Sequence, residues 1–77
     1  MISAEQLSFM VSLKIPYIVM NITDKLRVTS DVAFELLYSS VTYKLLSDER
    51  TYYWGESAQF VTESFIREYN GLPIEEF

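Results

Sequence analysis

The sequence predicts a small all-α protein, a single-domain bundle of three to five helices with an aromatic turn before the last helix. Apolar residues recur at steps of three and four, the period of a helix with one buried face. Most of these apolar runs begin just after a serine or threonine, residues that commonly cap a first helical turn. Because 49% of the 77 residues are hydrophobic and 16% aromatic, the chain is expected to fold as one domain over residues 1–77.

The first helix is expected over residues 4–26. Ser3 followed by Gln6 matches the capping box that begins many helices. The expected buried stripe is Leu7, Met10, Val11, Ile15, Ile18, Ile22 and Leu26. Pro16 lies in the middle of this helix, where it removes one hydrogen bond and clashes with a carbonyl, at a cost of about 3 kcal/mol. We therefore expect either a kink at Pro16 or two helices that meet near Ile15.

Two shorter helices are expected next. A capping signal at Thr29 and an acid at Asp31, where the helix dipole favours negative charge, begin a helix over residues 30–38. The polar pair at residues 39–40 then separates it from a helix over residues 41–47.

The last helix is expected to begin after a cap at Ser57 and to end at Asn70 and Gly71, with Pro73 just beyond. Residues 71–77 are then expected to form a tail.

Between these helices, Tyr52, Tyr53 and Trp54 precede Gly55. The segment favours extended structure but is too short to form a sheet alone, so we expect a loop or one arm of a small ribbon. Three neighbouring rings cannot all face one core, so at least one is expected to be partly exposed. Exposed Tyr and Trp are common in protein interfaces, whereas the alternative is that the rings fold back over a small core.

Charge is concentrated in the last third of the chain. Residues 1–46 carry four basic and four acidic side chains, whereas residues 47–77 carry two basic and seven acidic ones, which accounts for the net charge of −5. Two interpretations stay open: an acidic surface that meets a basic partner, or a solvated face that keeps the protein soluble. Six Lys and Arg residues in total do not form the basic stripe that direct nucleic-acid binding needs.

The side chains of common catalytic and metal sites are missing. Without Cys or His the chain lacks disulfides, thiolate nucleophiles, imidazole bases and the usual zinc ligands. Gly55 and Gly71 lie too far apart to form a glycine-rich phosphate loop. The acidic pairs at residues 48–49 and 75–76 are expected in exposed segments that do not activate a carboxylate.

Activation of a serine by lysine is not expected either, because Lys14, Lys25 and Lys44 are placed at solvent-facing helix positions. The sequence therefore predicts no catalytic residue, no cofactor and no metal, and a protein that is not an enzyme.

The most apolar stretch near the N-terminus, residues 9–20, is interrupted by Lys14 and Pro16 and followed by Asn21. It is shorter than the roughly 20 apolar residues that span a bilayer. No basic segment precedes it and no small-residue cleavage site follows it, so a soluble, cytoplasmic protein without membrane association is expected.

One resemblance covers nearly the whole chain. Residues 29–40, residues 43–49, the aromatic turn and the cap at Ser57 resemble a group of short, uncharacterised bacterial all-helical proteins. Members of that group are often encoded beside proteins that resemble ADP-ribosyltransferase toxins. The resemblance implies an antitoxin or immunity role and brings no catalytic or ligand-binding residue. Pro16 is a departure from the pattern.

These observations predict a non-enzymatic protein–protein interaction module, antitoxin-like, that occludes a basic or phosphate-binding protein partner. The expected partner-binding residues lie in the acidic last third and are Tyr52, Tyr53 and Trp54 as anchors, surrounded by Glu49, Glu56, Glu63 and Glu68. The alternative is a structural or regulatory homo-oligomer whose apolar helix faces pack against copies of themselves.

Overall fold

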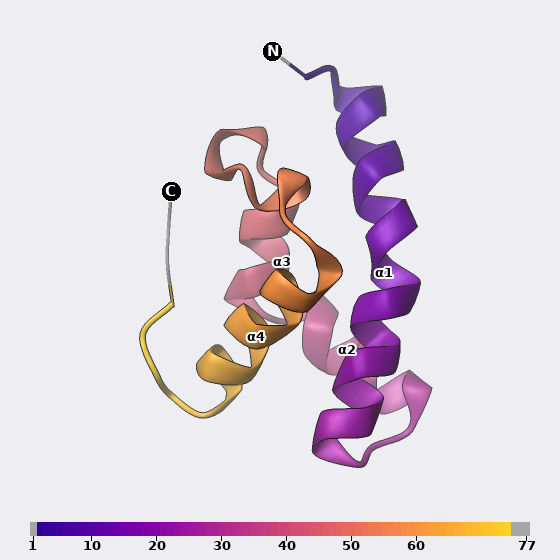
Figure 1. Cartoon of the computed structure of the whole chain (residues 1–77), viewed down its shortest axis with the longest axis vertical. Coiled ribbons are helices and arrows are strands. Elements are labelled where there is room, and N and C mark those ends of the chain that lie inside the picture. Colours follow the sequence, from indigo (N-terminus) through magenta and orange to yellow (C-terminus); the bar gives the residue numbers. More distant parts are fainter. Residues whose placement is uncertain (1, 75–77) are drawn as a thin grey trace.

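A computed structural model, which describes residues 2–74, contains four α-helices with two 3-10 turns before the last helix (Figure 1). The elements in chain order are α1 (Ala4–Leu26), α2 (Ser30–Tyr38), α3 (Val41–Leu46), η1 (Glu49–Thr51), η2 (Tyr53–Gly55) and α4 (Ala58–Tyr69). No strand occurs among residues 2–74, and the predicted all-α class is confirmed.

Capping side chains set where each helix begins. Ser3, Thr29, Ser40 and Ser57 each accept a hydrogen bond from the backbone N–H three residues further on. Gln6 completes the predicted capping box by accepting from the backbone N–H of Ser3. Each such cap contributes about 1 kcal/mol, which is why the predicted helix starts are correct.

Pro16 does not divide the first helix. α1 runs without interruption for 23 residues, so the expectation of two helices meeting near Ile15 is wrong. Five α1 side chains are buried on the side facing the other elements: Val11, Ile15, Ile18, Val19 and Ile22. Burying each contributes about 1.5–3 kcal/mol, so their sum exceeds the roughly 3 kcal/mol that the proline costs.

The core lies where α1 meets the rest of the molecule. α1 forms one side of the protein, on the right in Figure 1. The helices α3 and α4 and the 3-10 turns form the opposite side, to the left of α1 in that view. The α1 residues named above pack there with Ala33, Leu37, Leu46, Tyr53, Val61 and Phe65. Among the described residues, none of the helices is both long enough and apolar enough to cross a membrane.

The chain after α4 reverses at Gly71, whose φ of 73° is the left-handed conformation that glycine adopts freely. The N–H of Leu72 donates to the carbonyl of Arg67 at 2.8 Å, so the predicted helix stop is confirmed. Of the expected tail, residues 71–74 are non-helical, and residues 75–77, with their acidic pair, lie outside the described residues.

Candidate protein-binding surface

The aromatic segment folds as two consecutive 3-10 turns. Its backbone hydrogen bonds are local, from Thr51 to Asp48, from Gly55 to Tyr52 and from Glu56 to Tyr53. No second strand is present among residues 2–74 to pair with it, so the ribbon arm, one of the two expected states, does not form. The buried Thr51 hydroxyl donates to the carbonyls of Leu45 and Asp48, which fastens the turn to the end of α3.

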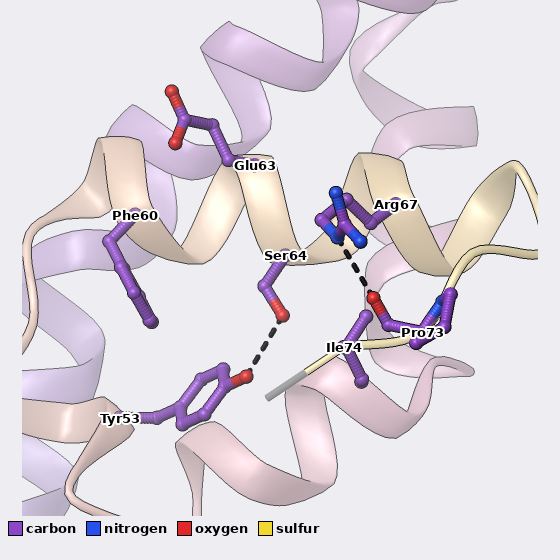
Figure 2. A pocket seen from close by; sticks show the side chains of 7 residues that line it. All are labelled: Tyr53, Phe60, Glu63, Ser64, Arg67, Pro73 and Ile74. Atoms are coloured by element: carbon purple, nitrogen blue, oxygen red, sulfur yellow. Dashed lines mark hydrogen bonds between the residues drawn. The ribbon is translucent and has the colours of Figure 1, made fainter. Parts of the chain in front are cut away.

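The three neighbouring rings have different environments. Tyr53 is fully buried, shares a 3.0 Å hydrogen bond with Ser64 and packs edge-on against Phe60 (Figure 2). Trp54 is half-buried, whereas Tyr52 is 64% exposed, so the expectation of an exposed ring is confirmed. Tyr53, however, is a core residue, and its assignment as a partner-binding anchor is wrong.

Tyr52 joins the two turns in an unusual backbone conformation. Its φ of 64° and ψ of 6° lie in the left-handed region, which costs a non-glycine residue about 1–2 kcal/mol. This reversal directs the Tyr53 ring into the core and leaves the Tyr52 ring in solvent. The Tyr52 ring centroid lies 6.1 Å from that of Trp54, with the planes tilted by 40°.

Trp54 is held from two directions. Its indole Nε1 donates to the carbonyl of Glu49 at 2.8 Å, and its own carbonyl accepts from the ammonium group of Lys14 on α1. The expected solvent-facing position of Lys14 is therefore wrong, since this side chain is half-buried against the turn. These two hydrogen bonds fix the position of Trp54, and the Tyr52 ring lies beside the Trp54 ring.

A shallow hollow of about 440 Å³ lies beside these rings, lined by Ile2, Glu49, Arg50, Tyr52 and Trp54. The structure thus brings together three of the predicted binding residues, Glu49, Tyr52 and Trp54. We call these three residues the aromatic-turn surface.

Arg50 places a positive charge next to this surface, and Asp48 pairs with it. The guanidinium donates to both carboxylate oxygens, at 3.0 Å from Nε and 2.7 Å from Nη2. These side-chain bonds, helped by the backbone N–H of Arg50, lower the pKa of Asp48 from 3.8 to about 2. Because Asp48 pairs with Arg50, the exposed carboxylate of Glu49 leaves the hollow and its border with a net negative charge.

The remaining predicted glutamates do not join the aromatic-turn surface. Glu56 is half-buried just after η2, and Glu63 is exposed on α4. Glu63 lines a different hollow, of about 510 Å³, and its carboxylate points away from Tyr53 and Ser64 (Figure 2). The same hollow is bordered by the bond from Arg67 Nε to the Pro73 carbonyl, at 2.8 Å.

Glu68 has a structural role that the sequence did not disclose. Its two carboxylate oxygens accept from the backbone N–H groups of Val41 and Thr42, each at 2.8 Å, and from the Thr42 hydroxyl. It therefore caps the first turn of the six-residue helix α3, where a negative charge is favourable. Its assignment as a partner-binding charge is corrected, because both oxygens are engaged within the fold.

Within residues 2–74, no group of three or more acidic side chains is placed to hold a metal ion. A comparison of this chain with known proteins finds no relative: no family model, no curated protein and no solved structure matches it.

Proposed function

We propose that this chain is a non-enzymatic protein-binding module that contacts its partner through the aromatic-turn surface. One observation carries the proposal: the Tyr52 ring is 64% exposed on a backbone held in the left-handed region. The left-handed backbone costs the isolated fold stability, and the ring left in water adds none by burial. A partner that covers the ring would recover its burial, and buried tyrosines are frequent binding hot spots.

Charge favours a basic partner. Residues 47–77 hold the whole net charge of −5, and Glu49 presents an exposed carboxylate beside the two rings. A complementary positive surface, such as one that binds a phosphorylated ligand, would be attracted over a distance and oriented by this field. Glu56 and Glu63 contribute to the field without belonging to the contact itself.

The resemblance to small bacterial proteins encoded beside ADP-ribosyltransferase-like toxins supports an antitoxin or immunity role. In this proposal the module acts by occlusion: Tyr52 and Trp54 cover the partner's phosphate-binding site, and no bond is made or broken. The proposed setting is the cytoplasm of a bacterium.

Titration calorimetry against the product of the neighbouring gene tests the proposal. Tyr52→Ala should weaken binding by about 2 kcal/mol or more, as expected for a hot spot. Tyr69→Ala is the matched control, because Tyr69 is 54% exposed on α4, away from the turn. Wild-type affinity in the Tyr52→Ala variant, or equal losses in both variants, contradicts the proposal. Trp54→Ala is less informative, because this indole also supports the turn.

A further inference from the structure

α1 carries a second apolar stripe on the side turned away from the core. Phe9, Leu13, Tyr17 and Met20 are between 54% and 62% exposed, and Pro16 is exposed among them. An α-helix turns about 100° per residue, which places these five positions on one face, opposite the buried α1 residues. We call this set the outer stripe.

The outer stripe is comparable in size to the largest apolar patch of a typical monomer, a patch that is often functional. Four large side chains, each more than half exposed, leave roughly 500 Å² of mostly apolar surface in water. Single exposed hydrophobic residues are ordinary, whereas a continuous patch of this size is often an interaction site.

We propose that the outer stripe is a homodimer interface in which α1 packs antiparallel against α1 of a second copy. The spacing of the stripe is the same in both chain directions, since Phe9, Leu13, Pro16 and Met20 follow at steps of four, three and four. A two-fold axis at the middle places Phe9 opposite Met20 of the second copy, and Leu13 opposite Pro16 of the second copy. These four positions of the stripe therefore pair with themselves, and the same axis places Tyr17 opposite Ser12 of the second copy.

The area fits a weak, specific dimer. Two fully covered stripes of roughly 500 Å² bury roughly 1,000 Å² together, which is below the range of stable complexes and within that of weak ones. We therefore expect weak association, with a dissociation constant on the order of 10–100 μM.

Charge also selects a second copy over a basic partner. Within α1, Glu5 and Asp24 balance Lys14 and Lys25, so the helix has no net charge although the chain carries −5. Lys14 is the one charged residue between Phe9 and Met20, and its ammonium group is turned toward Trp54. The α1 face therefore adds no local charge repulsion when two copies meet there, whereas a basic partner is drawn to residues 47–77.

Sedimentation equilibrium of the full chain over a range of concentrations tests this inference, which does not rest on the aromatic-turn surface. The wild type should dimerise with a dissociation constant on the order of 10–100 μM. Tyr17→Glu should raise this dissociation constant at least about tenfold. Tyr69→Glu makes the same change of charge on α4 and should leave it unchanged. A wild type that stays monomeric up to about 1 mM overturns the proposal. So do equal effects of the two variants, or a monomer that binds vesicles of anionic lipid through Tyr17.

Disulfide trapping tests the antiparallel register without a destabilising charge. The chain has no cysteine, so Phe9→Cys and Met20→Cys each introduce a single thiol at an exposed position. Oxidation of the mixed variants should give mainly the heterodimer, and each variant alone should crosslink several-fold less. Efficient crosslinking of Phe9→Cys to itself would mean parallel helices and overturns the proposed pairing.

Discussion

The aromatic-turn surface and the outer stripe of α1 both expose aromatic rings, but different physical causes put them there. The turn exposes Tyr52 through a strained backbone that the buried Thr51 and Tyr53 hold in place. The stripe follows from regular helix geometry, with no unusual dihedral angle. The turn lies in the acidic third of the chain, and the stripe lies on a helix of zero net charge. Exposure alone thus does not identify a partner, because strain and charge distinguish the two surfaces.

The largest expected effect is a loss of stability when the buried ring of the aromatic turn is removed, compared with a side chain of the outer stripe. Tyr53→Ala should lower the free energy of unfolding by about 3–5 kcal/mol, because it empties a buried site and removes the bond to Ser64. Leu13→Ala, in the stripe, should change it by less than about 0.5 kcal/mol in dilute solution. Urea unfolding followed by circular dichroism measures both. Similar losses of unfolding free energy in the two variants would contradict the assignment of Tyr53 to the core and Leu13 to the surface.

A smaller effect is expected at Lys14, whose ammonium group connects α1 to the aromatic turn. Lys14→Met removes the charged donor to the Trp54 carbonyl and should cost about 1–2 kcal/mol of unfolding free energy. Lys25→Met on the same helix is the control, expected to change stability by less than about 0.5 kcal/mol. Equal values from urea unfolding would mean that the link to the turn contributes nothing.

Relief of backbone strain should give a change of the opposite sign. Tyr52→Gly should leave the unfolding free energy equal or raise it by up to about 1 kcal/mol, since glycine adopts the left-handed region freely. Arg27→Gly tests the same physics at the end of α1, where φ is 58°. Thermal unfolding of both variants is the measurement. A clear loss of stability at Tyr52 alone would show that its ring supports the fold.

The smallest expected effect concerns the ion pair beside the hollow. The Arg50 guanidinium holds the pKa of Asp48 at about 2, so the stabilisation by this pair is complete above pH 3.8 and is lost as the pH falls toward 2. Arg50→Gln should raise the pKa of Asp48 toward 3.8 in a carboxyl-carbon NMR titration. Arg67→Gln should leave that pKa unchanged, because Arg67 bonds to Pro73 instead. An Asp48 pKa that stays near 2 in Arg50→Gln would exclude the pair as its cause.

Local signals explain how much of the fold was predictable. Caps at Ser3, Thr29 and Ser57, together with helical periodicity, predicted the helices nearly residue by residue, because caps act within a single turn. The continuity of α1 through Pro16 was not predictable in this way. It depends on burial against residues far along the chain, which local patterns do not contain.

The candidate surface was only partly predictable for the same reason. Tyr52 and Tyr53 are neighbours of the same type, and the backbone conformation that separates them is fixed by tertiary contacts. Glu68 looked like a surface charge because the backbone groups that it caps lie 26 and 27 residues earlier. The outer stripe did leave a signal, because residues 9–20 hold more apolar side chains than one buried helix face needs. The core stripe of α1 was by itself enough to predict the helix, so the additional apolar residues were not interpreted.

The position of Trp54 gives the protein a built-in optical reporter. It is the single tryptophan of the chain, it is half-buried beside Tyr52, and its indole nitrogen is already hydrogen-bonded. Its fluorescence therefore comes from the aromatic turn alone. Quenching by iodide should decrease when a partner covers the turn and stay constant when two α1 helices pair. Iodide quenching of Trp54 can thus distinguish the two associations without any label.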